Sequence, residues 1–105
     1  MTTFTRAEAE ALLPRVRPLL EDIQRRAASY ARRPSDPVAH ELHLLIAEVQ
    51  ALGVELKDPS VGLIDFRTLR RGREVYLCWK LGEGDHIAWW HEIEAGYPGR
   101  KIIED

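Results

Sequence analysis

The 105-residue sequence has a single cysteine, a single methionine and no long run of apolar residues. One cysteine cannot form a disulfide within the chain, which is typical of a reducing compartment. No apolar run approaches the roughly 18 residues that a membrane-spanning helix needs. Residues 1–14 carry Glu8 and Glu10 where a secretory signal peptide would have an apolar core. We therefore expect a cytoplasmic protein without a membrane partner.

The sequence also lacks an excess of positive charge. It has 15 Lys and Arg residues against 17 Asp and Glu residues, a formal net charge of −2. Proteins that bind nucleic acids usually carry a basic surface, because phosphate neutralisation supplies much of their affinity. The short basic cluster at residues 67–73 is typical of a solvated surface. We therefore expect no nucleic-acid partner, and the glycine-containing turns lack a phosphate-loop pattern that would imply a nucleotide cofactor.

The first half of the chain has the apolar period of helices. Thr5 and Glu8 form a capping-box pattern before an apolar stripe that continues to Tyr30. Pro14 and Pro18 fall inside this stripe and each removes a backbone donor, so we expect a bend, or one short helix followed by another.

A second apolar stripe runs over residues 38–52. Ser35 or Asp36 can cap this helix, and Gly53 follows its last apolar residue as a natural stop. Two helices over residues 1–53 predict a long antiparallel helical hairpin.

From Gly53 onward the apolar period changes to two. A short extended stretch and a turn at Asp58–Pro59 precede a strand that starts at Gly62 or Leu63, and the segments EVYLCWK and IAWWHEI form two further strands. The segment KIIED is read as a tail. We therefore predict a single α+β domain over residues 1–105, with a helical hairpin (1–53) followed by a three-stranded antiparallel meander and a C-terminal tail (54–105).

The length of the first helix bears on assembly. A helix over residues 6–33 would extend about 40 Å, whereas a compact domain of this size has a radius of gyration near 13 Å. Its wide apolar face has only one other helix to cover it. We therefore expect a homodimer in which the helices of two copies pack together.

One stretch, residues 74–92, combines the three tryptophans, Cys78 and His91. The tryptophans and Cys78 are read as packing residues, because a lone cysteine without a histidine motif is a weak sign of reactivity. Asp65 interrupts an apolar strand, and it can meet His91 if their strands flank the strand between them. Glu83 lies in the adjoining turn, and Glu92 follows His91 on the opposite face.

These residues leave two interpretations open. His91, Asp65 and Glu83 can hold zinc, iron or manganese, since histidine and carboxylates are common ligands of these metals. Alternatively, His91 and Asp65 form a buried hydrogen-bonded pair without a metal. Arg100 can bind an anion or pair with a nearby acid.

Four segments carry a family resemblance: FTRAEAEALLP, LKDPSVGLIDF, LCWKLGE and WHEIEAGYPGR. Together they resemble a bacterial family known as domain of unknown function 2203. The resemblance implies a stand-alone bacterial protein with a helical hairpin and a sheet, and no assigned reaction. The positions that this family emphasises match Glu8, Asp58, Asp65, Gly82, Glu83, His91, Gly96 and Arg100. This match adds weight to a metal site of Asp65, Glu83 and His91, with Glu8, Asp58, Glu92 and Arg100 as further polar candidates.

Three functions are consistent with these observations. The first is a homodimeric binding protein with a metal site on its sheet. The second is a metal-dependent, hydrolase-like enzyme in which His91 and carboxylates activate water. The third is a metal-free interaction or regulatory module that uses the helical face.

Overall fold

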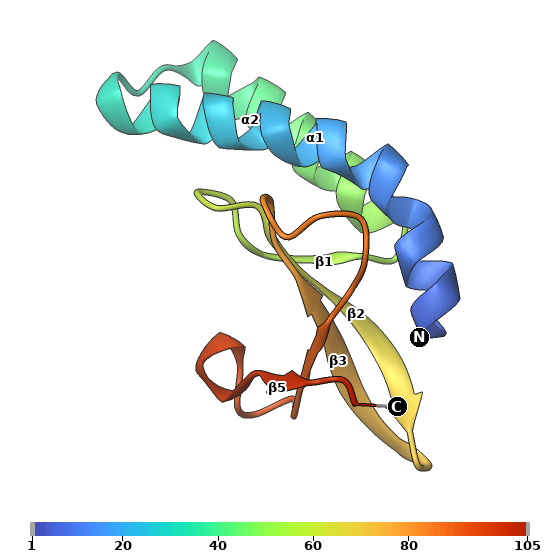
Figure 1. The fold of residues 1–105 in the computed structure, drawn as a ribbon. Coiled ribbons are helices and arrows are strands. Elements are labelled where there is room, and N and C mark those ends of the chain that lie inside the picture. The colour runs from blue at the N-terminus through green and yellow to red at the C-terminus, as the bar shows by residue number, and fades with distance from the viewer. Residues whose placement is uncertain (1, 105) are drawn as a thin grey trace.

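The computed structural model describes residues 2–104, which form two helices, a five-stranded sheet and one short 3-10 helix (Figure 1). The elements are α1 (Arg6–Arg32), α2 (Asp36–Ala51), β1 (Glu55–Asp58), β2 (Leu63–Arg70), β3 (Arg73–Trp79), β4 (Trp89–His91), η1 (Tyr97–Gly99) and β5 (Lys101–Ile102). The strands lie in the order β1-β2-β3-β4-β5, and all neighbours are antiparallel. The predicted α+β class is confirmed.

The prediction of three strands is wrong, because the sheet has an additional strand at each edge. β1 covers the stretch predicted as extended chain, and β5 lies in the predicted tail, where it pairs with Trp89 and Trp90. β1 has four residues and β5 has two. Segments this short hold too few alternations to show a period of two. Only pairing with a neighbouring strand defines them.

The β2–β3 hairpin is longer than the sequence indicated. Arg70 pairs with Arg73 across a two-residue turn, in which Arg71 has φ 53° and Gly72 has φ 78°. Two consecutive positive φ angles are typical of the type I′ turn, whose twist matches that of a hairpin. Residues 67–70, which the sequence marked only as part of a basic cluster, therefore continue β2.

The ends of both helices follow the local sequence. Thr5 Oγ1 accepts a hydrogen bond from the Glu8 amide at 3.1 Å, and Glu8 Oε1 accepts one from the Thr5 amide at 2.8 Å. Ser35 caps α2 by accepting from the Val38 amide, and Gly53 follows the helix with φ 84°. The predicted capping box, the cap at Ser35 and the stop at Gly53 are confirmed.

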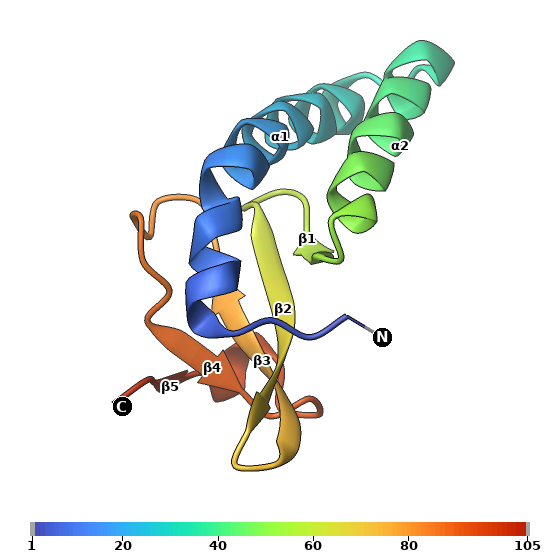
Figure 2. The ribbon, with the colours of Figure 1, turned by 90° about the vertical axis from the view of Figure 1, so that its right-hand side faces the viewer.

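Helix α1 is continuous through Pro14 and Pro18. Its axis changes direction between the dark blue first turns and the paler remainder of the helix (Figure 2). Each proline removes one helical hydrogen bond and its ring displaces the carbonyl four residues earlier, which bends a helix. The predicted bend is therefore confirmed. The alternative prediction, one short helix followed by another, is wrong because α1 is a single helix.

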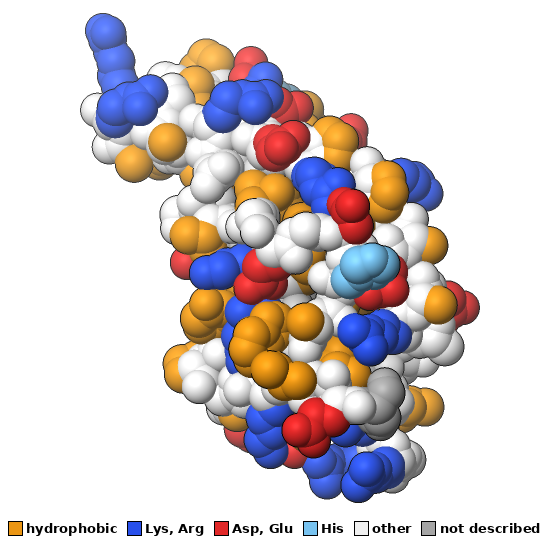
Figure 3. Space-filling model, viewed as in Figure 1, with side chains coloured by type: hydrophobic (Ala, Val, Ile, Leu, Met, Phe, Trp, Pro, Cys, Tyr) orange, Lys and Arg blue, Asp and Glu red, His pale blue; other side chains and the backbone are white. Residues whose placement is uncertain are grey.

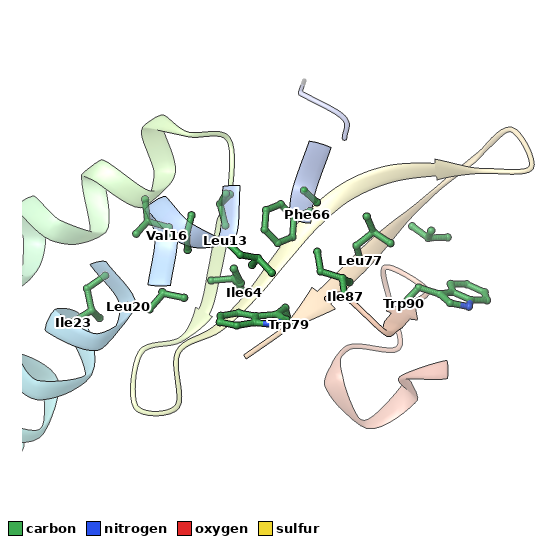
Figure 4. Packing of buried hydrophobic residues seen from close by; sticks show 14 residues of the cluster. Leu13, Val16, Leu20, Ile23, Ile64, Phe66, Leu77, Trp79, Ile87 and Trp90 are labelled. Carbon is green, nitrogen blue, oxygen red and sulfur yellow. The ribbon is translucent and has the colours of Figure 1, made fainter. Parts of the chain in front are cut away.

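The hydrophobic core lies between α1 and one face of the sheet. Leu13, Val16, Leu20 and Ile23 of α1 are buried in one cluster with side chains of the strands and of the segment before β4 (Figure 4). The strand side chains of this cluster are Ile64, Phe66, Val75, Leu77, Trp79 and Trp90, and Ile87 comes from the segment before β4. Burial of each such side chain contributes about 1.5–3 kcal/mol. Because side chains alternate along a strand, the residues between them point to the opposite face.

The two helices extend past the sheet (Figures 1 and 2), and the molecule measures 45 × 24 × 24 Å. Arg26 Nε and Glu41 Oε2 join α1 to α2 at 2.9 Å. No helix within residues 2–104 is long and apolar enough to cross a membrane.

Candidate metal centre

Three neighbouring strands bring Asp65, Cys78 and His91 together on the face of the sheet opposite α1. Asp65 of β2 is the direct partner of Cys78 in β3, and Tyr76 of β3 is the partner of His91 in β4. The potential ligand atoms of Asp65, Cys78 and His91 all lie within 4.8 Å of one another. Their exposed fractions are 3%, 0% and 1%. The predicted convergence of Asp65 and His91 across an intervening strand is confirmed.

The ring of His91 has a defined orientation. Nδ1 lies 2.8 Å from the backbone oxygen of Glu92, and Nε2 lies 3.1 Å from Asp65 Oδ1. A carbonyl oxygen can only accept, so Nδ1 carries a hydrogen and donates it. Histidines that bind metals commonly donate one ring N–H to a carbonyl in this way and present the other nitrogen to the ion. Nε2 is thus the nitrogen available to a ligand.

One proton lies between His91 and Asp65, because either Nε2 donates to the carboxylate or a protonated carboxyl donates to Nε2. Burial raises the pKa of Asp65, while the charge of His91 and its hydrogen bond act in the opposite direction. In both arrangements, a metal ion bound to Nε2 and Oδ1 would displace this proton.

Cys78 is a protonated thiol at neutral pH. Burial and the neighbouring Asp65 carboxylate raise the pKa of Cys78 to about 12, although the Arg100 guanidinium opposes the shift. The thiol therefore keeps its proton beside Asp65. A metal ion would replace that proton, since the thiolate is the form that binds metals.

A hollow of about 300 Å³ reaches this group from the surface. Asp65 and His91 line it together with Lys57, Tyr76 and Tyr97. Asp65 and His91 are therefore part of its wall, whereas Cys78 does not line it.

A network of hydrogen bonds supports the wall of the hollow. The Tyr76 hydroxyl donates to Glu55 Oε1 at 2.7 Å and accepts from Arg67 Nη2 at 2.6 Å. Lys57 Nζ lies 3.1 Å from Glu55 Oε1 and 4.6 Å from the centre of the Tyr76 ring. Burial disfavours ionised Glu55, but the bonds to Tyr76 and Lys57 outweigh it and lower the pKa of Glu55.

Glu83, the third ligand expected from the sequence, lies outside this group. Its two carboxylate oxygens accept from Arg100 Nη1 and Nη2, both at 2.7 Å, and Oε1 also accepts from the Lys80 amide at 3.0 Å. The Arg100 guanidinium lies 4.8 Å from the centres of both the Trp89 and the Tyr97 rings. Arg100 therefore pairs with a nearby acid, which is one of the two roles expected for it.

The remaining sequence candidates have other positions. Glu8 belongs to the capping box of α1. Asp58 accepts from the Ser60 amide and hydroxyl at 2.9 and 2.6 Å, and it also lines the hollow. The Glu92 side chain pairs with Arg73 at 2.6 Å, while its backbone oxygen holds the His91 ring.

The sequence analysis assigned Cys78 to packing, and nothing in its local pattern pointed to a ligand. Alternation along the strand did place Cys78 on the same face as Tyr76. Only the pairing of β2 with β3 then puts Cys78 next to Asp65. Lys57 and Tyr97 gave no signal, because their approach to the hollow depends on β1 and on the 3-10 turn.

One protein family matches most of the chain. The family model described as an uncharacterized conserved protein, domain of unknown function 2203, matches residues 28–103. The chain belongs to this family. The matched range includes Asp65, Cys78 and His91 and three of the four segments that carried the resemblance. Comparison with curated proteins and with solved structures gave no match. The function of this member of the domain of unknown function 2203 family must therefore be argued from its site.

Proposed function

We propose that this protein binds one divalent transition-metal ion through Asp65, Cys78 and His91. One observation carries the proposal: a carboxylate, a thiol and an imidazole from three adjacent strands present buried ligand atoms within 4.8 Å of one another. Cys78 replaces Glu83 in the ligand set expected from the sequence.

The distances suit a tetrahedral ion after small movements. Zinc bonds of about 2.0–2.3 Å would separate its ligand atoms by roughly 3.3–3.6 Å. The Nε2 to Oδ1 distance is already 3.1 Å, and the largest separation in the group stays below 4.8 Å. The ligand atoms that lie farthest apart would have to approach by up to about 1 Å to contact one ion.

The ligand chemistry favours zinc or iron over manganese. A thiolate is a soft ligand and prefers zinc and iron, whereas manganese prefers sites made of oxygen ligands. Three protein ligands also leave one position of a tetrahedral ion open, as in catalytic zinc sites. That position would face the hollow beside Asp65 and His91.

Cobalt(II) provides the test, because cobalt bound to a thiolate has a near-ultraviolet charge-transfer band. We expect the reduced protein, purified without chelator, to take up about one cobalt ion and to show this band. Cys78→Ser should abolish the band, and His91→Gln should weaken cobalt binding at least tenfold. His86→Gln is the matched control, since His86 is 84% exposed and lies outside the group. A wild-type protein without the band would contradict the proposal.

A second candidate, a metal-dependent hydrolase-like enzyme, is favoured by the position of the hollow. An ion with an open position beside a hollow of about 300 Å³ could bind and activate water. We would assay zinc-loaded protein against nitrophenyl esters and phosphates, with Cys78→Ser as the metal-deficient control. Turnover that equals the control's would exclude these substrate classes.

We also propose that two copies associate through their helices. The support is the reach of α1 and α2 beyond the sheet, together with exposed Tyr30 and Leu44 on those helices. This association is compatible with either function, because the metal centre lies on the other side of the sheet from α1.

A further inference from the structure

We propose that a cleft beside the end of the β2–β3 hairpin binds a small organic acid with an apolar body. The cleft holds about 450 Å³ and is lined by side chains from the face of the sheet that packs against α1. The hairpin continues past the first turn of α1, so the helix does not cover the end of this face (Figure 2). The cleft is therefore separate from the proposed metal centre, which lies on the opposite face.

The floor of the cleft is apolar and belongs to the edge of the hydrophobic core. Val75, Leu77 and Trp90 line it and are 0%, 6% and 8% exposed. Phe4 and Ile103, which are partly buried against the core, line it as well. Small-molecule sites are typically concave and mostly apolar, with a few polar groups that orient the ligand. The apolar body of a ligand would pack against this floor.

Thr68 is a polar residue in this wall without a partner in the protein. It lines the cleft and is 7% exposed, yet its hydroxyl makes no hydrogen bond to any residue in the range 2–104. Most buried polar side-chain atoms have a hydrogen-bond partner, and each exception needs an explanation. A ligand oxygen in the cleft would accept a hydrogen bond from this hydroxyl.

Arg71 lines the cleft and makes no ion pair or hydrogen bond with the described part of the chain. It is the first residue of the two-residue turn, and its φ of 53° is in the left-handed region that asparagine and glycine adopt more readily. The turn alone would therefore favour another residue. Residues in such conformations cluster at ligand sites, which indicates a role for the Arg71 guanidinium outside the turn.

The side chains that line the cleft carry more positive than negative charge. Arg6, Arg70 and Arg71 line it against one acid, Glu8, which belongs to the capping box of α1. Arg70 lies over the Trp90 ring, 4.6 Å from its centre, and forms part of the wall. The guanidinium groups of Arg6 and Arg71 remain to meet a ligand with one negative charge.

Arg6 retains donors for such a ligand. Its Nε donates to the backbone oxygen of Ile87 at 2.8 Å and lies 3.7 Å from Glu10 Oε2. Glu10 has a closer partner in the Ile87 amide at 2.7 Å. The two terminal nitrogens of Arg6 make no hydrogen bond within residues 2–104. Arg6 is also the first residue of a 27-residue helix, whose dipole favours an anion at this end.

These groups fit a carboxylate better than a phosphate. A phosphate ester carries up to two negative charges at neutral pH, and phosphate sites usually combine several arginines or backbone amides around one group. A carboxylate carries one charge on two oxygens. One oxygen can accept from Arg71 or Arg6 while the other accepts from Thr68.

The experiment titrates phenylbutyrate into the isotope-labelled protein and follows the tryptophan indole N–H resonances by NMR. We expect a saturable shift of the Trp90 resonance and none of the Trp79 resonance, because the Trp79 indole donates to Gly84 and does not line the cleft. Phenylbutyramide has the same shape without the charge and should bind at least tenfold more weakly.

Three variants test the residues. Arg71→Asn should weaken phenylbutyrate binding at least tenfold without lowering the midpoint of thermal unfolding, because asparagine suits this turn. Thr68→Val keeps the size of the side chain, removes the hydroxyl and should weaken binding severalfold. Arg73→Gln is the matched control and should bind as wild type does, since Arg73 lies in the same hairpin, pairs with Glu92 and does not line the cleft.

The inference would be overturned by the absence of a saturable Trp90 shift, by equal affinity for the amide, or by equal losses in Arg71→Asn and Arg73→Gln. None of these outcomes bears on the proposed metal centre, which the cobalt band tests. A tripeptide ending in phenylalanine, titrated in parallel, distinguishes the two sources of a carboxylate. Tighter binding than phenylbutyrate assigns the site to peptide C-termini, and weaker binding assigns it to free acids.

Discussion

At the scale of single residues, two protons occupy the positions that a metal ion would take. One is the thiol proton of Cys78, and the other lies between His91 Nε2 and Asp65 Oδ1. Neither group needs an ion to be stable, since the raised pKa of Cys78 keeps its thiol protonated and both His91 ring nitrogens have partners. A metal must therefore compete with protons, and the proposed site should respond to pH.

We predict that zinc binding at neutral pH releases about two protons per ion and that affinity rises with pH. The sign follows from the pKa of Cys78, which is raised to about 12, so the thiol must lose a proton throughout the accessible range. Calorimetry in buffers of different ionisation enthalpy measures the release. Cys78→Ser should release about one proton fewer, and a pH-independent affinity would contradict the prediction.

Glu83 also has a role that is measurable at the residue scale. Burial raises its pKa, but the bonds from Arg100 and the Lys80 amide outweigh burial and lower the pKa of Glu83. A carboxyl group with a lowered pKa stabilises the fold above its unfolded value near 4.5, and this contribution is lost as pH falls through the folded value.

We predict that Glu83→Gln lowers the free energy of unfolding by about 2–3 kcal/mol at pH 7, because it leaves the Arg100 charge without its partner. The difference from wild type should shrink as pH falls below 4.5. Urea unfolding at pH 7 and in acid measures both effects. Asp85→Asn is the control, since Asp85 pairs with Arg17 at an exposed position where about 0.5 kcal/mol or less is expected.

At the scale of elements, the β2–β3 hairpin assembles the site. The turn at Arg71 and Gly72 sets the register that places Asp65 opposite Cys78. A slip of one residue would move every side chain of a strand to the other face of the sheet. The proposed metal centre therefore depends on a turn at the far end of the hairpin.

We predict that Gly72→Ala destabilises the protein by about 1 kcal/mol, whereas Gly72→Asn costs clearly less. A Cβ atom at Gly72 would meet nothing within 4 Å, so the cost comes from its φ of 78° and not from a clash. Asparagine tolerates this conformation better than alanine does. Thermal unfolding of the two variants measures the difference, and equal stabilities would exclude the backbone explanation.

At the scale of the whole molecule, the helices reach beyond the sheet and carry apolar side chains into solvent. Leu44 is 52% exposed and Tyr30 is 39% exposed. A groove lined by Tyr30, Ala39, Leu42, His43 and Ile46 lies between the helices. On the face shown in Figure 3, acidic and basic side chains are interspersed, with apolar side chains between them.

We predict a mass of about twice 12.1 kDa by light scattering at high concentration. The double variant Tyr30→Glu/Leu44→Glu should shift the equilibrium toward the monomer, because it places charge on the proposed interface. Leu69→Glu is the control, since Leu69 is 60% exposed but lies in the β2–β3 hairpin. A wild-type mass of 12.1 kDa would contradict the dimer.

The elements that sequence alone determined are those whose signals are local. The capping box at Thr5, the cap at Ser35, the stop at Gly53 and the bend at Pro14 and Pro18 all depend on residues within one or two turns. The alternation of β3 is local as well, since Val75, Leu77 and Trp79 face the core while Tyr76 and Cys78 point to the opposite face. Such features are predictable because backbone hydrogen bonding and side-chain period act over a few residues.

Tertiary structure decided what depends on pairing between distant segments. β1 and β5 are strands only because neighbours complete their hydrogen bonds. Cys78 joins Asp65 and His91 because strand register, which the apolar alternation alone does not encode, brings three strands into line. Glu83 leaves that group because Arg100, 17 residues away in sequence, offers a two-pronged ion pair between two aromatic rings. The alternation along the strands allowed Asp65 to meet His91, but the places of Cys78 and Glu83 are properties of the folded sheet.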